Sequence, residues 1–456
     1  MSDRTVPRYL TTLAEFAANT QLNDISEAAR TRARWVIADS IPVIAAGMQQ
    51  PEMKALVARQ LAGAAPGNAW VIGAGKRAGA LDAAQLNGTA GTWLELDEGN
   101  LFAKGHPGIQ VVPAAVALAQ EGGYSGAELL RAVALGYEVS ARISRAAQMR
   151  LAFHPHGTYG VIGAAVAAGV LKGFDTARMQ ELLNVAAPMG MATSRQTLLD
   201  GATVRNIFTG HSGLMGLTAA RLVECGFTGE IDSVGNVYGK GVYSDKFDPQ
   251  QAIAGLGSEW LIALSYFKLH PIGRYGHSAV DALEDLLAKV PGGKLELAQI
   301  ERIEVRAYML AASLAGKNIV SSFGARFSVP FALASILYLG RSGLKSFDDD
   351  AVANRDVQAL VQHVDLQEDP SFTARFPKEQ PVTVRIVLRN GATYDGQCVV
   401  TKGEPAKPHT PAELSGKFFE LGEPVWGKGV TQELYDGLMR IEDIADFGAF
   451  AATLDL

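Results

Sequence analysis

Apolar residues recur at helical spacing from the N-terminus to about residue 265, and Gly and Pro interrupt them at intervals. A repeat of about 3.6 residues predicts amphipathic helices, and this region contains little of the alternation typical of strands. Two helix starts are marked by capping residues. Ser125 with Glu128 forms a capping box, and Asp175 precedes a helix that Pro188 ends. The apolar stripes that follow the two caps contain Leu129, Leu130, Val133 and Tyr137, and Met179, Leu182, Leu183 and Ala186.

The pattern changes after Tyr266, where short alternating segments begin. Residues 303–308 and 382–389 place apolar and polar side chains at alternate positions, which is typical of half-buried strands. Asn390-Gly391 then predicts a tight hairpin with two positive-φ residues, and the chain returns as a strand over residues 393–400.

Helical patterns near 329–341 and 349–363 lie between these strands, so this region predicts a small α+β domain. Residues 402–408 have the composition of a linker, and helical patterns resume at Thr410. Because 456 residues exceed what one core usually organises, we expect two domains and a mainly α fold. The expected division is a helical domain over 1–266, an α+β domain over 267–407, and helices over 408–456 that return to the first domain.

Composition narrows the function by exclusion. An apolar fraction of 48% with 19% charged residues fits a compact globular protein, and the net charge of -6 has no basic block that favours nucleic acid. Cys225 and Cys398 show neither metal nor redox spacing, so we expect a reducing cytoplasm. The N-terminus lacks an apolar signal core, and the run Val161–Leu171 is too short to span a bilayer, so no membrane partner is expected.

Two glycine-rich segments resemble nucleotide-binding loops but differ from them in spacing. Residues 72–79 have the spacing GxGxxxG and no βαβ unit around them, so they do not predict a dinucleotide site. Residues 235–241 lack both the four-residue gap between glycines and the Ser/Thr of a phosphate loop, and we interpret this second segment as a turn. His154-Pro-His156 would present two imidazoles to a metal from an extended segment, but no third ligand lies at a matching spacing. A structural or substrate-contacting role is favoured, and neither a metal nor an organic cofactor is expected.

Ionisable residues concentrate in three segments. Residues 93–108 combine three carboxylates with a histidine, which on their own also fit a solvated helix end. Residues 203–211 place a cation before a helix start, a position that suits a bound carboxylate or an ion pair. Residues 266–281 bring cations and histidines to the expected domain boundary, where clefts form. The candidate residues in these segments are Glu95, Asp97, Gly99, His106, Arg205, Lys268, Arg274 and His277.

These segments resemble the MmgE/PrpD family, which includes 2-methylcitrate dehydratases, cis-aconitate decarboxylases and iminodisuccinate epimerases. Residues 95–107 resemble its Asp-Phe-Asp/Asn-Asp-Thr-Trp element with the following His-Pro. Residues 153–158 resemble its Phe-His-Pro element, and residues 266–268 with His277 resemble its Phe-Lys segment with a histidine nine residues on. The resemblance covers essentially the whole chain. It implies a helical domain built from both chain ends, an α+β lid domain, a homodimer, a cleft active site, and no metal or organic cofactor.

Four positions depart from the decarboxylase and dehydratase patterns: Glu95 replaces Asp, Gly99 replaces Thr, Arg205 replaces Lys, and Phe331 stands where a Tyr is found. The residues around Gly99 are more similar to those of the epimerase-like branch of the family. We therefore expect a cofactor-independent lyase of the dehydratase type acting on a small di- or tricarboxylate. An epimerase of an iminodisuccinate-like dicarboxylate and a non-catalytic member of the fold are the alternatives.

Deprotonation next to a carboxylate creates an enediolate-like dianion, which preorganised cations and donors must hold. Burial of Lys268 at the domain boundary, beside other cations, favours its neutral amine, so Lys268 or His106 is expected to exchange the proton. Glu95 and Asp97 are expected to orient His106. The expected substrate contacts are Arg205, His154, Arg274, His277 and Gly99.

Overall fold

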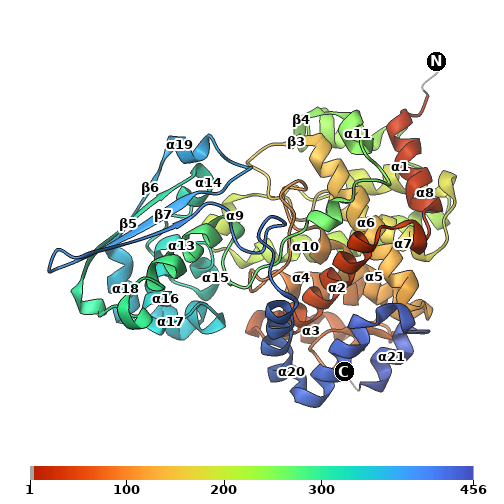
Figure 1. Ribbon diagram of the computed structural model, residues 1–456. Helices are drawn as coiled ribbons and strands as arrows, with labels where there is room; N and C mark the ends of the chain where they lie inside the picture. Colours follow the sequence, from red (N-terminus) through yellow and green to blue (C-terminus); the bar gives the residue numbers. More distant parts are fainter. Residues whose placement is uncertain (1–4, 455–456) are drawn as a thin grey trace.

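The computed structural model describes residues 5–454 and divides them between two hydrophobic cores. One core is helical and includes buried residues from Tyr9 to Phe267 and again from Leu414 to Leu454. The other spans Ile272 to Cys398 and surrounds a sheet. Figure 1 shows the helical part on the right and the sheet with its helices on the left. The mainly α fold with a smaller α+β part is confirmed.

The helical part contains long helices and two small antiparallel strand pairs, β1 with β2 and β3 with β4. Its elements are α1 (Arg8–Asn19), α2 (Glu27–Met48), α3 (Pro51–Leu61), β1 (Ala69–Val71), β2 (Lys76–Ala78), α4 (Ala80–Gly91), α5 (Pro107–Gly122), α6 (Gly126–Ala146), β3 (Ala147–Met149), α7 (Gly160–Leu171), α8 (Thr176–Ala186), α9 (Gln196–Leu199), α10 (Ile207–Glu224), α11 (Ser233–Gly239), β4 (Ser244–Phe247), α12 (Pro249–Ile253), α20 (Pro411–Met439) and α21 (Phe447–Thr453).

The α+β part is built on a four-stranded sheet in the order β6-β5-β7-β8. β5 pairs parallel with β6 and antiparallel with β7, and β7 pairs antiparallel with β8. Val305 faces Val384 and Ile303 faces Ile386 across β5 and β7, so the predicted alternation places apolar side chains in one core. Its elements are α13 (His277–Leu287), β5 (Ile300–Ala307), α14 (Met309–Ala312), α15 (Ser322–Ala325), α16 (Val329–Leu339), α17 (Asp349–Ala353), α18 (Arg355–Gln362), β6 (Val364–Glu368), α19 (Pro370–Thr373), β7 (Val382–Leu388) and β8 (Thr393–Cys398).

Both predicted helix caps are present. The Ser125 hydroxyl accepts from the Glu128 amide at 3.2 Å, and the Glu128 carboxylate accepts from the Ser125 amide at 2.8 Å. Asp175 accepts from the Arg178 amide at 2.8 Å at the start of α8. These bonds satisfy amides that have no partner within the helix, and the apolar stripes that follow are buried.

Three local predictions need correction. In the hairpin between β7 and β8, Gly391 has a φ of 85° but Asn390 does not share this conformation. The Asn390 side chain instead accepts from the Ala392 amide, which suits a three-residue loop that ends in a left-handed glycine. The helix predicted over 349–363 breaks at Asn354, whose side chain caps α18. Residues 235–241 were interpreted as a turn, but Asp232 caps a short helix there, α11.

The C-terminal chain returns to the helical part, where α20 packs against α2. Lys417 of α20 donates to Asp39 of α2 at 2.5 Å and to the Leu96 carbonyl oxygen at 2.6 Å. Both ionic side chains are buried. Because Leu96 lies between Glu95 and Asp97, the returning helix fixes the backbone that carries two predicted site residues.

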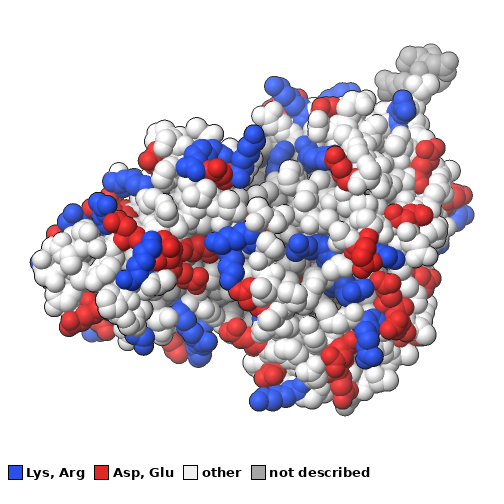
Figure 2. All heavy atoms as spheres, in the orientation of Figure 1, with Lys and Arg blue, Asp and Glu red and all other residues white. Residues whose placement is uncertain are grey.

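The surface and the helices give two further observations. On the face shown in Figure 2, Lys and Arg side chains are interspersed with Asp and Glu over both parts of the molecule. Among residues 5–454, no helix combines the length and apolar character needed to cross a membrane.

Candidate active site

A cavity of about 350 Å³ lies where the two parts of the molecule meet. Its walls come from the segments after α4, around β3 and before α10, and from the α+β part. The ionisable side chains that line it include the predicted residues Glu95, His106, His154, Arg205 and Arg274, together with Lys104, Arg150, Arg195, Tyr266 and Tyr275. The three segments singled out in the sequence therefore converge on one cavity.

The segment between α4 and α5 is held in an irregular but well-bonded conformation. Gly99 and Tyr266 form an antiparallel bridge, with amide-to-carbonyl distances of 3.0 and 2.8 Å. Glu95 adopts a left-handed φ of 53°, a conformation that is costly for a non-glycine residue and that concentrates at functional sites. A β-carbon added to Gly99 would lie 2.3 Å from the Tyr266 hydroxyl and 2.9 Å from Nδ1 of His106. Gly99 does not line the cavity, and it instead allows these side chains to approach the backbone.

Four buried charges form a compact ionic network. Arg205 Nη2 lies 2.5 Å from Oε1 of Glu95, and Lys268 Nζ lies 3.2 Å from Oε2 of Glu95 and 3.2 Å from Oδ1 of Asp97. Burial alone would raise the pKa of Asp97, but His106, Lys268 and Arg205 outweigh it and hold that pKa below its ordinary value. Two carboxylates and two cations balance, so the network adds no net charge to the site.

Lys268 has a different environment from the one predicted. Its side chain is fully buried and does not line the cavity. Its nearest charged groups are the two carboxylates of Glu95 and Asp97, whereas the sequence argument placed it beside cations. Lys268 therefore contacts two carboxylates directly, and its predicted part in proton transfer stays a prediction beside that of His106.

His106 lines the cavity and contacts a carboxylate of this network. It is the N-cap residue of α5, and Pro107 at the first helical position has the φ that a helix start requires. Nδ1 of His106 lies 2.6 Å from the Glu98 carbonyl oxygen and 3.1 Å from Oδ2 of Asp97. Two acceptors at Nδ1 place the ring proton there, so Nε2 carries the free lone pair. Burial lowers the pKa of His106 to about 4, against the opposing effect of Asp97, so the imidazole is neutral at neutral pH.

The side chain of Glu98 anchors this segment to the helical core. Its Oε1 accepts from the Gly108 amide at 2.5 Å, in the first turn of α5, and its Oε2 lies 3.1 Å from the Tyr137 hydroxyl. Burial raises the pKa of Glu98 to about 8, although the bond from Gly108 opposes the shift. Glu98 thereby fixes the carbonyl group that orients His106.

His154 and His156 extend the row of rings. The His156 ring lies edge-on to His106 with centroids 4.9 Å apart and edge-on to His154 at 4.4 Å. Burial, with Arg205 as the next cause, holds the pKa of both His154 and His156 well below the ordinary value. The Nε of Arg205 lies 3.3 Å from Nε2 of His154, so His154 presents a neutral ring beside that guanidinium.

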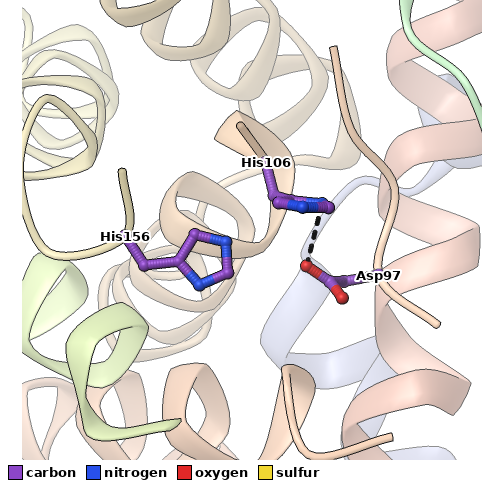
Figure 3. Close-up of side chains that lie close together, drawn as sticks. All are labelled: Asp97, His106 and His156. Atoms are coloured by element: carbon purple, nitrogen blue, oxygen red, sulfur yellow. Dashed lines mark ion pairs between the residues drawn. The ribbon is translucent and has the colours of Figure 1, made fainter. Parts of the chain in front are cut away.

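Asp97, His106 and His156 (Figure 3) form one of two groups among residues 5–454 whose side chains could hold a metal ion; the other is His270, Asp281 and Glu284. Each offers one ligand atom, and these atoms lie within 4.8 Å of one another. Asp97 also already pairs with Lys268, and Nδ1 of His106 faces a carbonyl oxygen. A metal ion at this place would share Asp97 with Lys268, and the two cations nearby, Lys268 and Arg205, oppose a divalent ion.

The remaining predicted residues divide between the cavity and its surroundings. Arg274 lines the cavity, but it pairs with Glu404 at 2.5 Å and lies over the Tyr266 ring at 4.2 Å. His277, which is expected to contact substrate, is not among the residues that line the cavity. Its Nε2 lies 3.0 Å from the Ile272 carbonyl oxygen at the start of α13, away from the cavity lining.

Arg195 lines the cavity and was not identified from the sequence. Among residues 5–454 no carboxylate lies within ion-pair distance of it, and its one polar side-chain contact is Ser313 Oγ at 3.4 Å. It lies in a Ser-Arg-Gln stretch with no motif to mark it. A partly buried guanidinium without a counter-ion is suited to bind an anion.

Comparison with known families agrees with the fold. Residues 11–251 match the MmgE/PrpD N-terminal domain and residues 270–436 match the MmgE/PrpD C-terminal domain. The chain therefore belongs to the MmgE/PrpD family. The C-terminal match extends into α20, although this helix packs in the helical core.

Similar proteins include several cis-aconitate decarboxylases. The enzyme of Aspergillus terreus is 26% identical over 95% of this chain and 94% of its own length. The Homo sapiens cis-aconitate decarboxylase is 24% identical over 82% of this chain and 79% of its own length. The cis-aconitate decarboxylase-like protein oryM of Aspergillus oryzae is 24% identical over 84% of both chains.

Proposed function

We propose that this protein is a lyase that transfers a proton at the carbon next to a carboxylate group of a small di- or tricarboxylate. The observation that carries the proposal is the neutral imidazole of His106, which lines the cavity with its Nδ1 proton tied to the backbone. Similarity to cis-aconitate decarboxylases over most of the chain supports the class of substrate.

In this mechanism Nε2 of His106 accepts the proton, and the electron pair left on carbon delocalises into the carboxylate as an enediolate. Arg195, which has no carboxylate partner among residues 5–454, supplies positive charge for a substrate carboxylate, and Arg205 lines the same cavity while it pairs with Glu95. Asp97, 3.1 Å from Nδ1, stabilises the imidazolium that forms. Lys268 keeps both buried carboxylates compensated while this charge moves.

The group that leaves decides the overall reaction. In a dehydration, the β-hydroxyl departs with the bonding electron pair, takes up the proton that the imidazolium of His106 holds and leaves as water, and a double bond forms. In a decarboxylation no proton is removed first: the bond to a carboxylate carbon breaks, CO2 departs, and the bonding pair remains on the substrate. His106 then transfers to that carbon a proton taken up from water. Both outcomes use the same imidazole and the same cations. Because the relatives are decarboxylases, cis-aconitate is the first substrate to test.

The experiment is incubation with cis-aconitate and with hydroxy and imino di- and tricarboxylates in heavy water, followed by proton NMR. A lyase converts one of these acids into an unsaturated product or releases CO2, with deuterium entering the carbon next to a carboxylate. Exchange without net conversion, or with a change of configuration, would instead assign an epimerase. If every acid keeps its C–H signals unchanged, the protein is a non-catalytic member of the fold.

A further inference from the structure

The chain crosses between the two parts of the molecule twice, and the two crossings lie against each other. The helical core ends at Phe267 and resumes at Leu414, whereas the second core spans Ile272 to Cys398. A β-carbon added to Gly403, in the second crossing, would lie 2.4 Å from the Phe267 carbonyl oxygen, where the first crossing starts. A group bound at this junction can therefore contact both connections.

Three side chains that can bind a metal ion gather at the junction. They are His270 of the first crossing, and Asp281 and Glu284 of α13. Asp281 and Glu284 are three residues apart, so they lie on one face of the helix. Each of the three residues offers one donor atom, and these atoms lie within 4.8 Å of one another. None of the three lines the cavity, so this cluster is separate from the candidate active site.

The donor atoms that face one another have no other partner. Nε2 of His270 lies 3.7 Å from Oδ1 of Asp281, which is too far for a hydrogen bond but close to the separation of about 3.4 Å between two ligands of a tetrahedral zinc ion. Oδ2 of Asp281 accepts from the Lys402 amide at 2.7 Å, which orients the carboxylate. In the described part of the chain, the buried Nδ1 of His270 has no hydrogen-bond partner, and the exposed Glu284 carboxylate has neither a hydrogen bond nor an ion pair.

The charges at the junction favour a divalent ion. The nearby cations Arg274 and Lys402 form ion pairs with other carboxylates. Among residues 5–454, no lysine or arginine lies within ion-pair distance of Asp281 or Glu284. Two carboxylates without a basic partner are stabilised when a cation binds between them. The group around Asp97 differs, because two cations beside it already supply positive charge.

We propose that His270, Asp281 and Glu284 bind a divalent transition-metal ion such as zinc, with water completing its coordination. One imidazole nitrogen and two carboxylate oxygens suit zinc, cobalt or manganese, whereas calcium and magnesium prefer oxygen ligands alone. Because Asp281 also accepts from Lys402 in the second crossing, the ion links both connections to α13. Its role is structural and independent of the proposed function, since none of its ligands lines the cavity.

The test is titration calorimetry of the metal-free, full-length protein with zinc chloride, together with thermal melting followed by circular dichroism. All samples carry Cys225→Ser, because the exposed thiol binds zinc by itself. The parent protein is expected to bind zinc more tightly than magnesium and to melt at a higher temperature with zinc, since an ion bound only by the folded chain stabilises it. His270→Gln and Glu284→Gln should each weaken zinc binding at least about tenfold and reduce the rise in melting temperature.

Two matched controls remove the same kinds of group elsewhere in the α+β part. His363→Gln and Glu296→Gln lie outside the cluster and should bind zinc as the parent does. Because Glu284 is exposed, its variant keeps the test valid even if His270→Gln does not fold.

Three results would overturn the inference. The first is a parent protein that binds no zinc, or that binds magnesium more tightly than zinc. The second is a folded cluster variant that binds zinc as tightly as its control, which would assign the ion to another place, such as the group around Asp97. The third is zinc that binds without raising the melting temperature, which contradicts a structural role at the junction.

Discussion

Replacement of Lys268 by methionine tests the ionic network most severely. The substitution keeps a similar apolar length but removes the cation that lies 3.2 Å from both Glu95 and Asp97. The remaining cation, Arg205, contacts only Glu95. Asp97 is thereby left buried without an ion-pair partner other than a neutral imidazole. Removal of one partner of a buried pair costs about 3–5 kcal/mol, so we expect a loss of stability in this range.

The loss should depend on pH in a defined direction. In the wild type the pKa of Asp97 is below its ordinary value, so its ionised form contributes stability above the unfolded pKa of about 3.9, and this is lost as pH falls through the folded pKa. Without Lys268, burial raises the pKa of Asp97 with less opposition from nearby cations. Protonation of Asp97 then removes the buried unpaired charge of the variant as pH falls. The loss in free energy of unfolding relative to the wild type is therefore largest near pH 7 and becomes smaller toward pH 4.

The assay is chemical denaturation followed by circular dichroism at pH 7 and pH 5, with the single variants Lys268→Met and Asp97→Asn and the double variant. The double variant should recover most of the loss, because both members of the pair are then uncharged. Lys289→Met, which removes the exposed pair with Asp285, is the control and should cost less than about 1 kcal/mol. A loss in Lys268→Met no larger than in this control would refute the counter-ion role.

Three further outcomes follow from the site. Gly99→Ala should lower kcat and cost roughly 1–3 kcal/mol of stability because the new methyl group overlaps the His106 ring, whereas Gly416→Ala, with open space around it, should be neutral in melting experiments. The pH profile of kcat/KM should fall on the acid side near a pKa of about 4, because His106 must be neutral in the free enzyme, and a midpoint near 6.5 would argue for another group. Exhaustive chelation should leave activity unchanged, and a loss restored by one divalent ion would make Asp97, His106 and His156 metal ligands.

The sequence predicted elements well where local signals were strong. The caps at Ser125 and Asp175 and the strand alternation around Val305 each depend on residues a few positions apart, and the structure confirms them. Turn details were less secure. Asn390 did not adopt the predicted positive φ because its side chain found a local hydrogen bond, a choice that sequence pattern does not reveal.

The sequence predicted which segments come together but not how their side chains are arranged. Glu95, His106 and Arg205 were found because family elements mark them, and they line one cavity. The placement of Lys268 between two carboxylates depends on a contact across more than 170 residues, which no local pattern encodes. Arg195 carries no motif at all, so only the folded chain identifies it. The roles assigned to these residues, and the homodimer, stay predictions.

The central claim is that His106, and not Lys268, exchanges the substrate proton. The most direct measurement is the rate of deuterium entry from heavy water into a bound polycarboxylate, compared among the wild type, His106→Asn and Lys268→Arg. The account predicts a loss of about 10²–10⁴-fold in His106→Asn and substantial exchange in Lys268→Arg, which keeps the buried charge. Exchange that persists in His106→Asn but disappears in Lys268→Arg would contradict it and return the proton-transfer role to the lysine.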